Sequence, residues 1–289
     1  MPSMEITTNQ NIYVSGDTVE GELIIKSDEK TKYNAIHLTF TGREHTRIVV
    51  SHGKTSTVHT DERVYFSQQI DLASEGEMTI EELRFPFHFI LPENLPSSYS
   101  GTHGWIEYML TAVIEKSWAR DPKKERAIMV RNTELMPSSE FQRAFIEKDG
   151  YSILDVEMDE DAFSLGSVIG LRFRVAQEIN IRGVRIELLA EEEASTEHYN
   201  RHNAYALTKQ YFEDSMIERG LWVDVGIETN ESMPSQFIRE ILSNQISVKI
   251  TLDVPLARDK SVSVPIKLGN YSHAAEREKR QSYDFTWDS

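Results

Sequence analysis

Three histidines in the first quarter of the chain are spaced by seven residues and could bind a metal ion. They are His45, His52 and His59, and the turn-forming run 51–54 predicts a β-hairpin centred near the middle one. Such a hairpin could place His45 opposite His59, where two imidazoles in register could hold a metal. A third ligand is not evident, because His52 lies at the tip, and a metal site needs a full ligand set. We therefore expect exposed hairpin histidines and no metal site.

The same hairpin carries cations in a chain that is otherwise acidic. Arg43, Arg47 and Lys54 could form a contact for an anion or a lipid headgroup if they cluster on one face. The alternative is a solvated hairpin whose cations pair with neighbouring carboxylates, those of Glu44, Asp61 and Glu62. Both interpretations remain open at the level of the sequence.

Four carboxylates alternate near the start of the second half: Asp155, Glu157, Asp159 and Asp161. On a strand they would share one face and attract a hard cation such as Ca²⁺. The pattern is not that of an EF-hand loop, because Glu160 stands where that loop needs a glycine. The acidity of the whole chain favours the alternative, a wet acidic strand face that binds no metal.

Three aromatic residues alternate in the polar C-terminal tail: Tyr283, Phe285 and Trp287. In an extended segment they would lie on one face. They could form a protein-binding linear motif, or a strand that adds to an open sheet edge in the same chain or in a partner. The alternative is a disordered tail whose aromatic residues have no role.

Motifs typical of enzymes are absent from the sequence. It has no Gly-x-Ser-x-Gly nucleophile motif, no phosphate-binding loop ending in Gly-Lys-Ser/Thr and no Gly-x-Gly-x-x-Gly. A hydrolase built on the loops of a β-fold is a weak alternative, because no nucleophile and base can be recognised as a pair. We expect no catalytic residues and no cofactor.

Charge and composition exclude several classes of protein. The 289 residues carry a net charge of −16, with 14 Lys and Arg against 20 Asp and Glu in residues 1–135, and 17 against 27 in residues 136–289. Such a chain would repel nucleic acid and a broad anionic membrane. No apolar run predicts a transmembrane segment, and the N-terminus lacks the pattern of a signal peptide. The absence of cysteine agrees with the cytoplasm, with peripheral contact at membranes as an option.

The elements that must position these residues are short strands. Apolar residues alternate with polar ones over short lengths separated by turn residues, as in 36–40, 85–89 and 106–112. This alternation gives each strand one buried and one wet face, which is typical of antiparallel sheets. The pattern predicts an all-β fold.

The second half of the chain repeats the first. Six features recur in the same order, including residues 13–21 with 163–170 and residues 95–99 with 233–237. We infer two tandem antiparallel β-sandwich domains, 1–135 and 145–270, with a linker at 136–144 and a tail at 271–289. Residues 203–219 contain helix formers, but the repeat predicts a strand there.

Several motifs in the first half resemble the arrestin N-terminal domain. They are Tyr13-x-x-Gly16-Asp17-x-Val19-x-Gly21, Ile36-x-Leu38-x-Phe40-x-Gly42, Phe85-Pro86-Phe87-x-Phe89-x-Leu91-Pro92 and Leu95-Pro96-Ser97-Ser98-Tyr99-x-Gly101-x-His103-Gly104. The resemblance is closest to the α-arrestins, or arrestin-domain-containing proteins, and the second half resembles the arrestin C-domain more weakly. It implies sandwiches of the immunoglobulin-like, arrestin type.

The resemblance implies a non-enzymatic adaptor or scaffold that binds other proteins. The implied partners are membrane-protein tails or sorting machinery, in the trafficking or regulation of membrane proteins. The alternative is a structural or regulatory arrestin-fold protein of the bacterial sporulation-control type, which acts by self-association. The chain has no Pro-Pro-x-Tyr motif, so recruitment of a ubiquitin ligase, as in many α-arrestins, is not implied.

Overall fold

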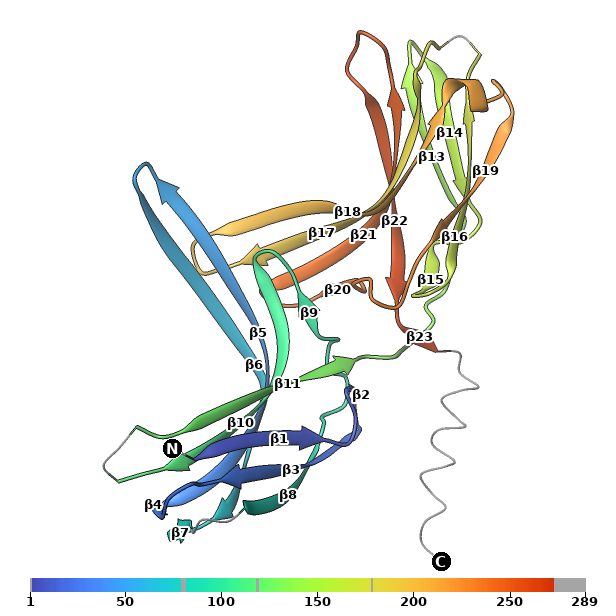
Figure 1. Cartoon of the computed structure of the whole chain (residues 1–289). Helices are drawn as coiled ribbons and strands as arrows, with labels where there is room; N and C mark the ends of the chain where they lie inside the picture. Colours follow the sequence, from blue (N-terminus) through green and yellow to red (C-terminus); the bar gives the residue numbers. More distant parts are fainter. Residues whose placement is uncertain (1, 79–81, 118–119, 178, 273–289) are drawn as a thin grey trace, which may run out of the picture. The chain divides into compact units, whose positions relative to one another are not determined.

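A computed structural model describes residues 2–78, 82–117, 120–177 and 179–272 of the chain (Figure 1). These residues divide into two compact units. The first holds the chain up to Asn132, with Ala194–Asn200 and Glu240–Leu242. The second holds Thr133–Glu193, Arg201–Arg239 and the described residues from Ser243 onward.

The first unit is built from two main sheets, which are antiparallel apart from the pairing of one short strand. The smaller sheet has the order β1-β3-β8, with bounds Ser3–Thr8, Thr18–Lys26 and Glu82–Ile90. The larger sheet has the order β2-β11-β10-β5-β6, with bounds Ile12–Val14, Lys123–Arg131, Gly104–Glu115, Ala35–His52 and Thr55–Ala73. The short β9 (Tyr99–Ser100) pairs with β10, and β4 (Thr31–Tyr33) pairs with β7 (Gly76–Met78).

The core of the first unit lies between these two sheets. Alternate residues of β5 point inward, so that Leu38 and Phe40 are fully buried while the residues between them are partly exposed. The Phe40 ring lies 5.6 Å from the ring of Phe89 on β8, between centroids, which joins the larger sheet to the smaller one. The period-two pattern of the sequence therefore marks the inner face of a sandwich.

The second unit repeats this architecture. Its smaller sheet has the order β13-β14-β16-β19, with bounds Gln142–Lys148, Tyr151–Met158, Val168–Val175 and Trp222–Glu228. Its larger sheet has the order β15-β22-β21-β17-β18, with bounds Ala162–Ser164, Lys260–Gly269, Leu242–Asp253, Gly183–Ser195 and Asn200–Glu213. The short β20 (Phe237–Ile238) pairs with β21 as β9 pairs with β10.

The strand orders of the two units correspond element by element. In each larger sheet the first strand is parallel to its neighbour, β2 to β11 and β15 to β22. Gly16 and Gly166 lie at the same point of the repeat and have nearly the same positive φ, 90° and 85°. The prediction of an all-β fold with two tandem antiparallel β-sandwiches is confirmed.

The ambiguous segment 203–219 is mostly strand. β18 continues to Glu213 and is followed by one 3-10 turn, Asp214–Met216. The repeat was the better guide there, because pairing with a neighbouring strand outweighs local helix propensity.

The chain between the two sandwiches is held on the second unit. The strand β12 (Glu134–Leu135) pairs with β23 (Tyr271–Ser272). The Asp161 carboxylate accepts a hydrogen bond from the Glu140 N–H at 2.9 Å and pairs with Lys267 Nζ at 3.1 Å. Burial acts to raise the pKa of Asp161, but these two partners outweigh it and hold that pKa below its ordinary value.

Candidate protein-binding surface

The strands β5 and β6 of the first unit extend past the rest of their sheet (Figure 1). They pair along their length up to the turn at His52 and Thr55. Their neighbour β10 pairs with β5 only as far as Gly104 opposite Thr46. Among the residues that the structure describes, no third strand pairs with residues 47–60, which form a two-stranded ribbon.

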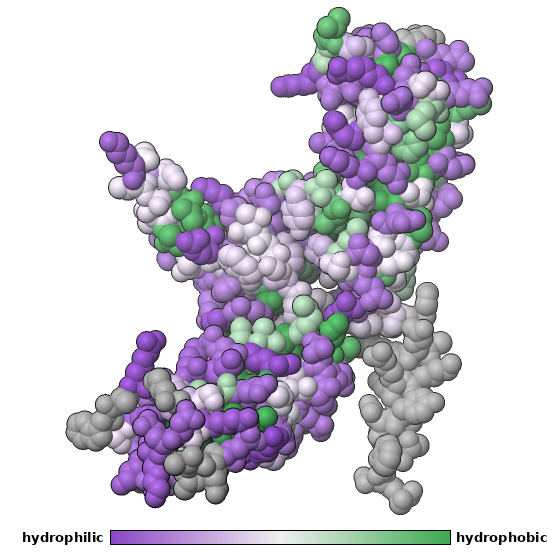
Figure 2. All heavy atoms as spheres, in the orientation of Figure 1, coloured by the Kyte–Doolittle hydropathy of each residue, from purple (hydrophilic) through white to green (hydrophobic). Residues whose placement is uncertain are grey.

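The ribbon differs from the rest of the chain in charge. Residues 45–60 contain no carboxylate, although the chain has 47 Asp and Glu residues. Val49 and Val58 lie directly opposite one another and are 41% and 47% exposed. Figure 2 shows a hydrophilic tip on the ribbon, with hydrophobic residues further back. A cationic, partly apolar projection of this kind suits contact with an anionic partner surface.

The predicted anion contact divides into two parts. Arg43 is held by two carboxylates, with Nη2 2.6 Å from Glu107 and Nη1 2.8 Å from Glu62. Partial burial acts to lower the pKa of Arg43, but the hydrogen bond and charge of Glu107, aided by Glu62, outweigh it and raise that pKa. Arg47 and Lys54 lie on the ribbon, and within the described ranges neither has an ion-pair partner.

A groove lies on the outer face of the larger sheet, where the ribbon begins. We call it the Trp105 groove; it has a volume of about 690 Å³ and its lining includes His45, Arg47, Thr60, Glu62, Trp105 and Glu107. The half-buried rings of His45 and Trp105 meet edge to face, 5.0 Å apart between centroids. A part-exposed tryptophan in a groove, beside an arginine that two carboxylates hold in place, is typical of a protein-binding surface.

Sequence reasoning did not single out Trp105 or Glu107. The signal was present, because Ile106, Tyr108 and Leu110 alternate as inward residues of β10 and are buried. The residues between them must then point outward on the opposite face.

The two outer histidines do not face one another. His45 is opposite Glu62, and His59 is opposite Ile48. The expectation that they lie in register is wrong, because the turn is centred between Gly53 and Lys54, after His52. Among the residues that the structure describes, no three His, Cys, Asp or Glu side chains converge as a metal site would need.

The alternating carboxylates of the second unit are engaged in different ways. Asp155 pairs with Arg174 at 2.8 Å, and Glu157 pairs with Arg172 at 2.7 Å. Asp161 lies beyond the end of β14 and is buried, so the expectation of one shared strand face fails for it. The tail residues Tyr283, Phe285 and Trp287 lie outside the described residues.

Comparison with known proteins finds a family model that matches the first unit. Residues 3–134 match the family model described as the N-terminal domain of arrestin, or S-antigen. The resemblance of the chain to the arrestin-like family, noted from its motifs, is confirmed. The described residues include no helix with the length and apolar character needed to cross a membrane.

Several relatives that match this chain are arrestin domain-containing proteins. Arrestin domain-containing protein 17 of Caenorhabditis elegans is 29% identical over 42% of this chain and 32% of its own length. Arrestin domain-containing protein 1 of Homo sapiens is 29% identical over 36% of this chain and 23% of its own. Arrestin domain-containing protein 4 of Mus musculus is 28% identical over 42% of this chain and 32% of its own length. These matches span about a third or less of each relative.

Proposed function

We propose that the chain is a non-enzymatic adaptor or scaffold of arrestin type, which binds other proteins in the transport or regulation of membrane proteins. The arrestin N-terminal domain at residues 3–134 supports the family role. The observation that carries the proposal is the Trp105 groove, an open site with an aromatic centre on the outer face of a rigid sheet.

The proposed partner segment is the tail of a membrane protein or a component of the sorting machinery. An extended segment would lie across β5 and β10, with an apolar side chain against Trp105 and His45. Arg43 keeps its place between Glu62 and Glu107, so the groove offers preformed polar edges that order little on binding. We place this activity in the cytoplasm, with peripheral contact at membranes.

We further propose that the ribbon assists by contacting anions or lipid headgroups through Arg47 and Lys54. Arg43 has no part in this contact, because two carboxylates already neutralise it. The absence of acidic residues from 45–60 supports the idea, since the remainder of the chain repels an anionic surface.

The relatives support the adaptor over self-association of the sporulation-control type. Several that match this chain are named arrestin domain-containing proteins and come from animals. No observation on the described residues favours the second function.

An array of synthetic peptides from cytoplasmic tails of membrane proteins, probed with the labelled full chain, tests the proposed function. We expect a subset to bind and Trp105→Ala to weaken that binding at least about tenfold, as loss of an aromatic anchor does. Thr111→Ala is the matched control, because Thr111 lies on the same strand with the same outward phase. Binding that is absent, or equal for the two variants, would contradict the proposal.

A further inference from the structure

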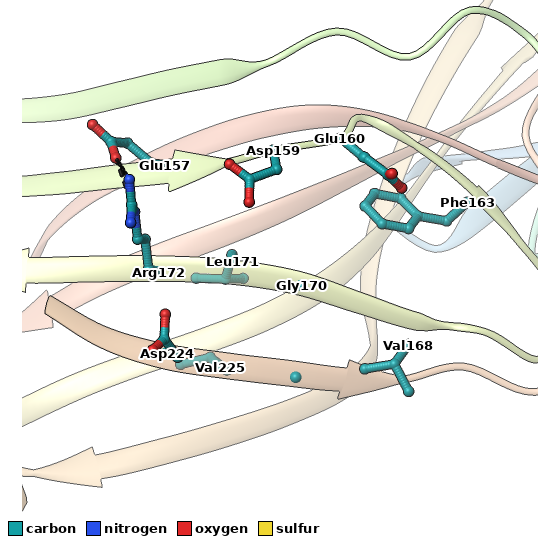
Figure 3. Close-up of a pocket in the computed structure, with 11 residues that line it drawn as sticks. Glu157, Asp159, Glu160, Phe163, Val168, Gly170, Leu171, Arg172, Asp224 and Val225 are labelled. Atoms are coloured by element: carbon teal, nitrogen blue, oxygen red, sulfur yellow. Dashed lines mark hydrogen bonds and ion pairs between the residues drawn. The ribbon is translucent and has the colours of Figure 1, made fainter.

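A second groove lies on the outer face of the smaller sheet of the second unit (Figure 3). It has a volume of about 490 Å³ and lies over β16 and β19, beside the end of β14. We call it the glycine groove; its lining includes Asp159, Glu160, Val168, Gly170, Asp224 and Gly226. Nothing in the proposed function uses this face.

The cations on this sheet face are already committed. Arg172 and Arg174 pair with Glu157 and Asp155. Both guanidinium groups also lie over the ring of Trp222, 4.9 and 4.7 Å from its centroid. Arg172 lies directly opposite Asp224 in the pairing of β16 with β19, but its guanidinium is bonded to Glu157 and forms no ion pair with Asp224 within the described ranges.

Three carboxylates around the groove have no ion-pair partner within the described ranges: Asp159, Glu160 and Asp224. Figure 3 shows Asp159 and Asp224 on opposite sides of β16, both pointing toward that strand. At the far end Val168 adds an apolar wall that is 57% exposed. The groove is thus lined by four carboxylates, counting Glu157, against the single arginine Arg172, and it is apolar at one end.

The floor of the groove consists of two glycines directly opposite one another, Gly170 on β16 and Gly226 on β19. Both are exposed, and neither has a positive φ. A Cβ atom on Gly170 would meet nothing within 4 Å, and one on Gly226 would meet only a methyl group of Val168, at 3.0 Å. Neither the backbone nor the packing of this unit requires a glycine there, although glycine weakens a strand interior.

The first unit provides an internal comparison. Val19 pairs with Phe89 there as Ile169 pairs with Ile227 here, so the next pair along the strands is equivalent. In the first unit that pair is Glu20 and His88. The positions in the first unit that are equivalent to Gly170 and Gly226 thus carry two full side chains. An exposed glycine that the fold does not need commonly marks a place where another molecule approaches closely.

We propose that the glycine groove binds an arginine side chain from an extended segment of a partner protein. The flat floor lets a planar guanidinium lie close to the backbone, and its five donors suit carboxylates on both sides. Val168 covers the aliphatic part of the side chain. The site goes beyond the proposed function, because it requires neither the Trp105 groove nor membrane-protein cargo.

A metal ion is a poorer occupant than an arginine. A hard cation needs several oxygen ligands within about 2.6 Å of one point. Across the described residues, no three carboxylates or imidazoles stand close enough together to hold a metal ion. A guanidinium can instead bond to separated carboxylates, because its donors point in several directions.

The test is titration of the full chain with a short synthetic peptide of alternating arginine and valine. Matched peptides carry lysine or uncharged citrulline in place of arginine. We expect the arginine peptide to bind at least about fivefold more tightly than the lysine peptide, since lysine is a point charge without bidentate geometry. The citrulline peptide should not bind.

Variants separate the groove from general attraction to an acidic chain. Asp159→Asn with Asp224→Asn should weaken binding at least about tenfold. Glu75→Gln with Glu93→Gln removes the same charge from exposed positions in the first unit and should change binding less than about twofold. Equal losses in the two double variants, or equal affinity for the lysine peptide, would overturn the proposal.

A second pair of variants fills the floor without changing charge. Gly170→Thr with Gly226→Thr should leave the melting temperature equal or higher and abolish binding of the arginine peptide. Trp105→Ala should leave that binding unchanged, so that failure of this site and failure of the proposed function are told apart. Unchanged binding in the threonine variant would also overturn the proposal.

Discussion

At the scale of single residues, alternation along a strand decides which side chains can reach a partner. Trp105 follows Gly104 in a strand whose even-numbered residues are buried, so its outward position could be predicted from the sequence. Whether His45 and His59 lie opposite one another could not be predicted from the sequence, because the strand register depends on which two residues form the centre of the turn. A shift of one residue there moves every side chain to the other face.

Asp161 carries the first stability prediction. Asp161→Asn removes a buried charge from Lys267 and should lower the free energy of unfolding by about 1–3 kcal/mol at neutral pH. Asp159→Asn is the control. The Asp159 side chain is exposed, so this substitution should change the free energy of unfolding by less than about 0.5 kcal/mol. Urea denaturation measures both, and equal effects would show that Asp161 does not anchor the linker.

The same residue gives a pH dependence with a defined sign. Because the pKa of Asp161 is lowered in the folded state, its contribution is complete above the pKa of an unfolded aspartate, about 3.9. This stabilising contribution of Asp161 is lost as the pH falls through the pKa that Asp161 has in the folded state, which is lower. The difference in stability between the parent and Asp161→Asn should therefore be constant from neutral pH down to about 5 and shrink below about 4. A difference that grows on acidification would contradict this account.

At the scale of elements, the equivalent strands β3 and β16 use glycine for opposite reasons. A Cβ atom on Gly21 would clash with the carbonyl oxygen of Thr7, whereas one on Gly170 would meet open space. Gly21→Ala should lower the free energy of unfolding by about 1–3 kcal/mol, and Gly170→Thr should raise it by about 0.5–1 kcal/mol. Denaturant unfolding of the two variants measures both changes. A lower free energy of unfolding in Gly170→Thr as well as in Gly21→Ala would show that β16 needs its glycine for folding.

The ribbon of β5 and β6 is the element on which the headgroup contact is tested. Two cations near an anionic surface contribute about 1 kcal/mol each, so Arg47→Ala with Lys54→Ala should weaken binding to vesicles rich in phosphatidylserine at least about tenfold. Lys30→Ala with Lys124→Ala removes the same charge elsewhere and should have little effect. Sedimentation of vesicles at low salt measures both, and equal losses would contradict a role for the ribbon.

At the scale of the whole molecule, the repeat in the sequence predicts the architecture because each sandwich buries its own alternating residues. Aromatic and glycine positions such as Tyr13 and Gly16 recur as Phe163 and Gly166 since both units need the same turn. The two grooves were beyond that prediction. They consist of outward residues such as Trp105 and Asp224, which no core constrains and which the repeat does not share.

The central claim is that this chain works by holding other proteins. Quantitative co-purification of the full chain from cells of its native host, beside Trp105→Ala and Thr111→Ala, tests it most directly. The account predicts that membrane proteins or sorting components are enriched with the parent and with Thr111→Ala, and are lost with Trp105→Ala. Retention of no protein, or of the same proteins by all three forms, would contradict it.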